Sequence, residues 1–113
     1  MPLKQRDIWL VPIPFSDLRS SKRRPVVVIS NDRYQETNDD CLVMAITSRI
    51  DPLNPYSLSF TDQDLEEGKL PKQSQIRTDK IFSIHQKIMM HRYGRLASAK
   101  FSESLQLLNR LVS

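Results

Sequence analysis

The amino-acid sequence predicts a mainly β (α+β) fold, a small and strongly bent β-barrel with a C-terminal helix and one short helical turn. Two observations predict this class. Short apolar and β-branched runs alternate with turn residues over most of the chain, and only the C-terminal segment has helical spacing. At 113 residues the chain is expected to form one domain, residues 1–113, too small for an extensive groove unless a second copy shares it.

The first predicted strand covers residues 7–15. Pro12 and Pro14 lack the backbone N–H that a central strand donates on both sides. We therefore expect this strand at an edge of the sheet or at a bulged exit from it. Residues 16–22 are polar and have no period, which predicts a loop.

Two buried strands are predicted next, at residues 25–30 and 41–46. The first contains the β-branched run Val26-Val27-Val28-Ile29, which is typical of a strand covered on both faces. Proline is tolerated at the first position of a strand, where Pro25 stands. Residues 31–40 are polar and begin with turn residues, so a loop connection is expected between the two strands.

Further strands and a turn follow. Residues 56–60 alternate polar and apolar, as a short strand does, and residues 61–64 match a capping box that predicts one helical turn ending at Gly68. Two more β-type runs are predicted at residues 74–84 and 87–96, with a turn or bulge at Gly94.

The end of the chain is the clearest helix. Ser98 is the expected N-cap, because its hydroxyl can accept from a free backbone N–H of the first turn. Apolar residues then recur at helical spacing and should form the packed face: Phe101, Leu105, Leu108, Leu111 and Val112.

Composition excludes several classes of protein. With 39% apolar and 27% charged residues, the chain is neither disordered nor membrane-spanning in character, and its first residues lack the apolar segment of a signal peptide. We expect a cytoplasmic protein. Cys41 is a candidate core residue rather than a nucleophile, and His85 and His91 have no neighbours at ligand spacing, so we expect no metal site and no cofactor.

Positive charge is segregated along the sequence. Residues 1–34 have a net charge of +4, residues 35–70 of −6 and residues 71–113 of +6. If the two basic thirds meet in space, they form a face that attracts phosphate. The acidic third would then lie on the opposite side or act as a lid.

Polar groups stand at the ends of the two buried strands. Arg24 precedes the first strand, and Thr47 and Ser48 end the second. In an antiparallel pair the start of one strand lies beside the end of the other, so Arg24 and Thr47 can face one pocket. A fixed guanidinium and a hydroxyl, without a base, suit a phosphodiester whose transition state gains negative charge. A strand-end threonine can also simply bond its own backbone.

These residues resemble the MazF/PemK-like (Kid-like) toxin family of bacterial type II toxin–antitoxin systems. The resemblance covers nearly the whole chain, in order and with similar spacing. The matching pieces are Asp7-Ile8, Lys22 through Asp32, Ala45-Ile46-Thr47-Ser48, Leu70-Pro71-Lys72 with Ser74, Arg77 through Ile81, and the helix after Gly94-Arg95-Leu96.

The resemblance implies an SH3-like barrel that works as a homodimer. It also implies a metal-independent, sequence-specific endoribonuclease that cuts single-stranded RNA and so inhibits translation and growth. A cognate acidic antitoxin is expected to lie over the RNA groove. The family pattern assigns catalysis to Arg24 and Thr47, with Ser48 assisting or capping the strand. The expected reaction is attack by the ribose 2′-OH on the adjacent phosphate.

Other residues are candidates for binding the RNA. Basic side chains that could contact phosphate are Arg19, Lys22, Arg23 and Arg77. Two positions depart from the family pattern. Arg6 stands where a glycine is usual, and Gln75 stands where a β-branched residue is frequent, which indicates a polar groove residue or an exposed strand face.

Two alternative functions remain open at this point. A gyrase-poison toxin of the same fold would act through its terminal helix and would not need Arg24. A non-catalytic SH3-like nucleic-acid-binding module would explain the basic charge but not the pairing of Arg24 with Thr47.

Overall fold

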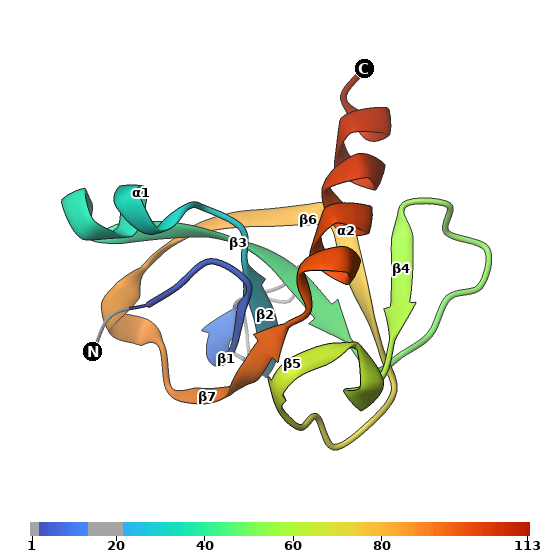
Figure 1. Cartoon of the computed structure of the whole chain (residues 1–113), viewed down its shortest axis with the longest axis horizontal. Helices are drawn as coiled ribbons and strands as arrows, with labels where there is room; N and C mark the ends of the chain where they lie inside the picture. Colours follow the sequence, from blue (N-terminus) through green and yellow to red (C-terminus); the bar gives the residue numbers. More distant parts are fainter. Residues whose placement is uncertain (1–2, 14–21) are drawn as a thin grey trace.

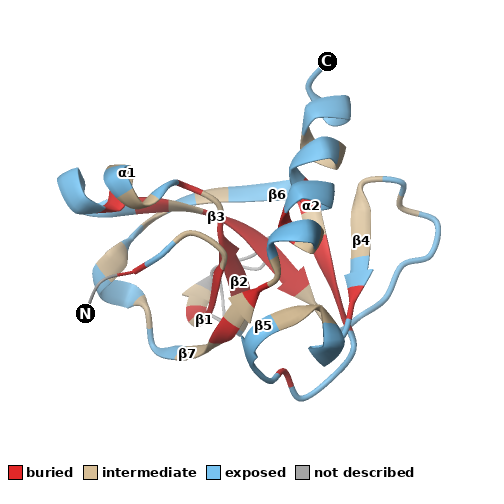
Figure 2. Cartoon of the chain, in the orientation of Figure 1, coloured by how far each residue is buried: buried red, intermediate tan, exposed pale blue. Residues whose placement is uncertain are grey.

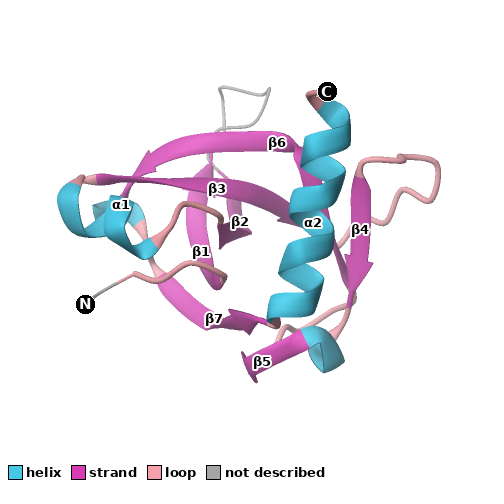
Figure 3. Cartoon of the chain, turned by 45° about the horizontal axis from the view of Figure 1, so that its top comes forward, coloured by secondary structure: helices cyan, strands magenta, loops and turns pink. Residues whose placement is uncertain are grey.

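The computed structural model describes residues 3–13 and 22–113. Over these residues it forms a seven-stranded antiparallel sheet in the order β4-β6-β3-β2-β1-β7-β5, which curls into a half-barrel (Figures 1 and 3). The strands are β1 (Asp7–Ile13), β2 (Lys22–Val28), β3 (Asp40–Thr47), β4 (Ser57–Phe60), β5 (Leu65–Gly68), β6 (Ser74–His85) and β7 (His91–Leu96). The helical elements are α1 (Asp32–Thr37), the turns η1 (Asp62–Asp64) and η2 (Gln86–Ile88), and α2 (Ser98–Leu111). The predicted bent β-barrel with a C-terminal helix is confirmed.

Both faces of the sheet are covered at its centre, where buried residues concentrate in β2 and β3 (Figure 2). Successive side chains of a strand point to opposite faces, so β2 contributes to two cores. Val27 packs in one core with Ile8 and Phe101, whereas Val26 and Val28 pack in the other. The β-branched run therefore forms a doubly covered strand, as predicted.

The first strand is not at an edge, which corrects one alternative of the prediction. β1 pairs with β2 on one side and with β7 on the other. Its pairing with β7 ends at Leu10, while its pairing with β2 continues through Pro12. Pro12 thus stands where the strand has lost one neighbour, and its missing N–H removes no bond to β7.

Three short elements were not predicted: α1, β5 and the turn η2, which precedes β7 where the β-type run at residues 87–96 was expected to begin. The connection after β2 contains the helix α1, which begins where the Asn31 side chain accepts a hydrogen bond from the Tyr34 N–H. The capping box at residues 61–64 is present, but the helical turn ends at Asp64 and not at Gly68, because residues 65–68 form the strand β5. None of these elements has the apolar periodicity that identifies helices and strands in a sequence.

The helix α2 packs beside β4 and β6 (Figures 1 and 3), but with a narrower face than expected. It begins after Ala97, which makes no side-chain cap, so Ser98 is the first helical residue and not the N-cap. Phe101 is buried and Leu108 packs against the core, while Leu105, Leu111 and Val112 are exposed. Among the described helices, none is long and apolar enough to cross a membrane.

The bulge predicted near Gly94 is present. Ile8 pairs with Gly94 and Trp9 pairs with Arg92, so Tyr93 is an additional residue of β7 without a counterpart in β1. A bulge of this kind bends the strand and turns the extra side chain in a new direction.

Candidate active site

The start of β2 and the end of β3 lie side by side, as the sequence predicted. The two strands are antiparallel, with Val26 opposite Ala45. The ladder ends at this pair, and beyond it Arg24 and Ser48 line the same pocket. Arg24 is paired with Val11 of β1, so its backbone is part of the ladder between β1 and β2.

Arg24 borders a pocket of about 220 Å³ at the end of the barrel. The pocket has an apolar wall and a polar, cationic rim. It is lined by Leu10, Arg23, Arg24, Pro25, Ile46, Ser48, Leu70, Pro71, Lys72, Ser74 and Tyr93. Cations and hydroxyls around an apolar hollow can bind a ligand with one charged and one flat apolar part.

Ser48, and not Thr47, is among the described residues that line this pocket. The Thr47 Oγ1 accepts a hydrogen bond from the Arg49 N–H at 3.1 Å. The local backbone role considered for this threonine is thus present. A hydroxyl that accepts in this way still carries a proton that it can donate to a ligand.

The other basic candidates are placed unequally. Arg23 is exposed at the rim of the pocket, next to Arg24. Arg19 lies outside the described residues, and so does the side chain of Lys22, although its backbone begins β2. Their contacts with RNA remain predictions.

Arg77 is already engaged by a carboxylate. Its Nε and Nη2 donate to the two oxygens of Asp79 at 3.0 and 2.9 Å. The guanidinium in turn lowers the pKa of the Asp79 carboxyl, mainly through this hydrogen bond. Arg77 is not among the residues that line the pocket, so a phosphate would have to compete with Asp79 for it.

Gln75 is not an exposed strand residue, which corrects one interpretation of this position, while its contact with RNA stays a prediction. Its side chain is buried, with 3% of the residue exposed. Both amide groups bond the backbone of Asp51, in the loop after β3. A polar residue in a strand predicts exposure, and sequence alone gave no sign of this distant partner.

The acidic third of the chain does not form a separate face. Glu66 and Glu67 of β5 lie against β7. Arg95 is 3.8 Å from Glu66 and 3.9 Å from Glu67, and Arg92 forms an ion pair with Glu67 at 2.7 Å.

Arg6, which stands where a glycine was expected, forms an ion pair with Glu66 at 3.3 Å. Its φ of 76° is the left-handed conformation that favours glycine, so the turn is kept despite the substitution.

Sequence reasoning assigned no role to Lys72, Ser74 or Tyr93, although all three line the pocket. Ser74 is buried and its hydroxyl donates to the Lys72 carbonyl at 3.0 Å. The sequence signal was the segment Leu70-Pro71-Lys72 with Ser74, which contributed to the family resemblance but to no predicted function.

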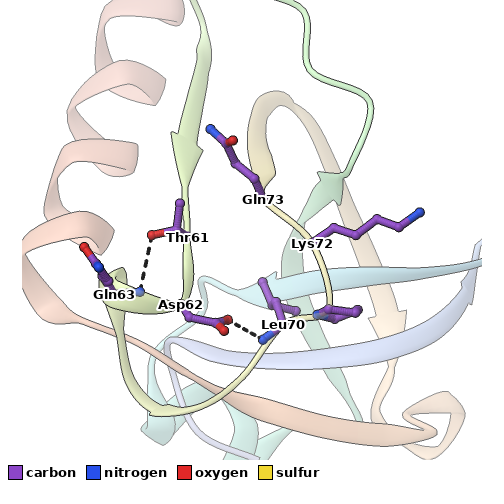
Figure 4. Close-up of a pocket in the computed structure, with 7 residues that line it drawn as sticks. Thr61, Asp62, Gln63, Leu70, Lys72 and Gln73 are labelled. Carbon is purple, nitrogen blue, oxygen red and sulfur yellow. Dashed lines mark hydrogen bonds between the residues drawn. The ribbon is translucent and has the colours of Figure 1, made fainter.

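The segment that carries Lys72 is fixed from its other side. The Asp62 carboxylate of η1 accepts a hydrogen bond from the Leu70 N–H at 2.6 Å (Figure 4). A second hollow of about 430 Å³ lies there, lined by Thr61, Asp62, Gln63 and residues 70–73. Leu70, Pro71 and Lys72 therefore form a ridge between two hollows.

Cys41 is not among the residues that line this pocket. Cys41 is buried, and burial is the main cause that raises its pKa to about 11, so the thiol is neutral at pH 7 and belongs to the core as predicted. Within the described part of the chain, no group of three His, Cys, Asp or Glu residues could hold a metal ion.

Solved structures share this fold over nearly the whole chain. An endoribonuclease from Mycobacterial species matches with a TM-score of 0.77 at 13% identity, covering 99% of this chain and 92% of that protein. An endoribonuclease in complex with its cognate antitoxin, also from Mycobacterial species, gives 0.74 and 14%, with coverage of 98% and 93%. The MazE–MazF complex from Deinococcus radiodurans gives 0.77 and 17%, with coverage of 99% and 97%.

Curated protein sequences give no significant match. A family profile, in contrast, matches residues 4–112, which is almost the entire length. The chain therefore belongs to the PemK-like, MazF-like toxins of type II toxin–antitoxin systems.

Proposed function

We propose that this protein is a metal-independent endoribonuclease that cuts single-stranded RNA at specific sequences and so stops translation and growth. The observation that supports the proposal is a cationic pocket, lined by Arg24 and by Ser48, at the neighbouring ends of β2 and β3. Solved proteins of this fold include endoribonucleases. Family membership adds that this chain is a toxin, and RNA is a substrate whose loss explains toxicity.

The reaction would use the RNA itself as the nucleophile. The ribose 2′-oxygen forms a bond to the adjacent phosphorus while its proton passes to water. The bond from phosphorus to the 5′-oxygen breaks, and that oxygen takes up a proton. The products are a 2′,3′-cyclic phosphate and a 5′-OH end, and DNA cannot react in this way because it lacks the 2′-OH.

The protein would supply electrostatic stabilisation. A guanidinium is a permanent cation in proteins, so Arg24 is suited to stabilising the charged phosphorane-like state and not to acting as a base. Thr47 would donate a hydrogen bond to a non-bridging oxygen. Both groups are on strands of the barrel, so they need little reorganisation when charge develops.

Two protein partners follow from the same assignment. One solved relative is in complex with its cognate antitoxin, and we propose that an acidic antitoxin likewise covers the cationic rim of this pocket. We also propose a homodimer. Sedimentation should then give twice the 13.2 kDa mass of the chain, and a mass of one chain at micromolar concentration would contradict it.

The function is tested by incubating the protein with mixed-sequence RNA in EDTA. Discrete fragments with 2′,3′-cyclic phosphate and 5′-OH ends are expected from the wild type. Removing one preorganised donor typically costs about 10²- to 10³-fold in rate, so Arg24→Ala and Thr47→Ala should both be severely impaired. Arg110→Ala, on α2 and away from the pocket, is the matched control.

Three outcomes separate the candidate functions. Wild-type cleavage by a folded Arg24→Ala variant would refute the assignment of Arg24. Intact RNA that is nevertheless bound, with binding lost at high salt, would favour the non-catalytic module. Neither cleavage nor binding by a folded wild type would favour the gyrase-poison alternative.

A further inference from the structure

We propose that the pocket beside Arg24 takes one unstacked nucleobase of the RNA, and that the base stacks on the ring of Tyr93. This inference rests on the proposed function, since it names the part of the substrate that this pocket binds. Tyr93 would thus be a binding residue that helps to place the neighbouring phosphate at Arg24.

The composition of the pocket fits a nucleotide. Its wall is apolar, with Leu10, Ile46 and Leu70 beside the tyrosine ring. Its rim carries Arg23, Arg24 and Lys72. Proteins that bind single-stranded nucleic acid combine aromatic rings for the bases with cations for the backbone, and this pocket offers both within one hollow.

The β-bulge of β7 determines the direction of this ring. Tyr93 is the extra residue between the pairs Ile8–Gly94 and Trp9–Arg92. In a regular ladder, neighbouring side chains would alternate between the two faces, and a bulge changes that alternation locally. Bulges are frequent next to functional sites because they re-aim a side chain in this way.

Close backbone packing holds the bulge in place. The Tyr93 carbonyl accepts a hydrogen bond from the Lys69 N–H at 3.3 Å. Gly68 and Gly94 have φ values of 83° and 159°, and they allow β5 to approach β7 here. A Cβ on Gly68 would stand 1.9 Å from the Tyr93 carbonyl oxygen, so only glycine permits this contact.

The ring itself is supported on two sides. Tyr93 packs against the core that includes Leu70 and Leu96, and it makes an edge-to-face contact with His91, with ring centroids 5.0 Å apart at 83°. A ring already held in one orientation loses little side-chain entropy when a base stacks on it. Its position is therefore suited to binding rather than only to filling the core.

The inference is tested with DNA oligonucleotides of mixed sequence, which can occupy the site but cannot be cut by 2′-OH attack. Binding is measured by fluorescence anisotropy for Tyr93→Leu and Tyr93→Phe. Leucine keeps apolar volume but has no π-face, so affinity should fall by about 5- to 150-fold, the range expected for one stacked base. Phenylalanine keeps the ring and should bind within about two-fold of wild type.

A second variant gives a direct signal that does not depend on affinity. Tyr93→Trp places an indole in the pocket, and its fluorescence should be quenched when a base stacks on it. The natural tryptophan, Trp9, is buried, and Tyr34→Trp on α1 serves as the control that should not be quenched. Equal affinity of folded wild type and Tyr93→Leu, or no quenching of Tyr93→Trp under saturating oligonucleotide, would overturn the inference.

These outcomes are separable from those of the proposed function. One outcome is that the wild type cuts RNA while Tyr93→Leu binds as tightly as the wild type and Tyr93→Trp shows no quenching. In that case the ribonuclease assignment stands and the stacking inference fails. If the wild type cuts no RNA, yet binding and quenching depend on Tyr93, the stacking site stands on a protein that binds nucleic acid without cleaving it.

Discussion

Gln75 and Asp51 form two hydrogen bonds with each other, and these join strand β6 to the loop that follows β3. The Gln75 Nε2 donates to the Asp51 carbonyl at 3.0 Å, and the Asp51 N–H donates to the Gln75 Oε1 at 3.0 Å. Gln75 is opposite Thr47 in the ladder of β3 and β6. The pair therefore fixes the chain just after the candidate catalytic residues.

Replacing Gln75 should loosen this loop. Gln75→Ala removes a buried partner from two backbone groups, which we expect to lower the free energy of unfolding by about 1–3 kcal/mol. Amide hydrogen exchange of Asp51 should become faster in the folded protein. Chemical denaturation and exchange measured by NMR check both effects.

Gln75→Glu refines this prediction. A carboxylate can still accept from the Asp51 N–H but cannot donate to the Asp51 carbonyl, so exchange at Asp51 should stay slow while stability falls. Gln63→Ala, at an exposed position of η1, is the control and should change neither quantity. Slow exchange at Asp51 in Gln75→Ala would show that the loop is held by other contacts.

Cys41 predicts a loss of stability at alkaline pH. The pKa of the Cys41 thiol is raised from 9.0 to about 11, mainly by burial and to a smaller extent by the charge of Asp40. The neutral thiol is favoured in the folded state. Its contribution to stability is therefore complete below the unfolded-state pKa and is lost as pH rises through the folded-state pKa.

The measurement is the free energy of unfolding between pH 8 and 11. The wild type should lose stability more steeply than Cys41→Ala, which has no group to ionise at this position. Native wild type should also react slowly with a thiol reagent at pH 8 and rapidly once unfolded. Identical pH slopes for the two proteins would contradict the prediction.

The elements that sequence predicted best are those whose own side chains enter the core. Uninterrupted apolar residues predicted the strand from Val26 to Val28 and the strand around Val43. Arg24 lies near the start of the first strand, and Thr47 ends the second. The candidate site could be proposed from sequence because antiparallel neighbours bring such ends together.

The elements that sequence missed depend on distant partners. β5 contains the charged residues Glu66 and Glu67. It is a strand because it pairs with β7, where Arg92 and Arg95 form ion pairs with these carboxylates. Tyr93 reaches the pocket through a bulge, which depends on the register between β1 and β7, two strands from opposite ends of the chain. No local pattern reports a register of this kind.

Asp62 predicts an effect on the site through the ridge of Leu70, Pro71 and Lys72. Its carboxylate accepts a hydrogen bond from the Leu70 N–H at 2.6 Å, in the hollow that Thr61, Asp62 and Gln63 also line (Figure 4). Asp62→Ala should displace Lys72 and lower kcat/KM for RNA by between about 10- and 100-fold, because small misplacements of positioning groups are costly. Asp62→Asn keeps an accepting oxygen and should recover most of the activity.

The control for this pair is Glu36→Gln, which removes an exposed carboxylate on α1. Thermal unfolding of all three variants separates a displaced ridge from a destabilised protein. Equal kcat/KM for wild type and a folded Asp62→Ala would mean that the ridge keeps its position without the hydrogen bond.

Thr47 and Ser48 predict different kinetic effects, although they are neighbours in sequence. As the proposed hydrogen-bond donor to the transition state, Thr47 should affect kcat. Thr47→Val keeps the shape without the hydroxyl and should lower kcat by about 10²- to 10³-fold with little change in KM. Ser48 lines the pocket, so Ser48→Ala should mainly raise KM.

Steady-state kinetics on one short RNA containing the cleavage site distinguish these roles. Thr47→Ser keeps a hydroxyl at this position and should be far more active than Thr47→Val. The Ser48 hydroxyl is still present in Thr47→Val, but it lies in the pocket and should not replace the missing donor. If Ser48→Ala loses kcat and Thr47→Val does not, the donor is the residue that lines the pocket. The bond from Thr47 to the Arg49 N–H would then be its whole role.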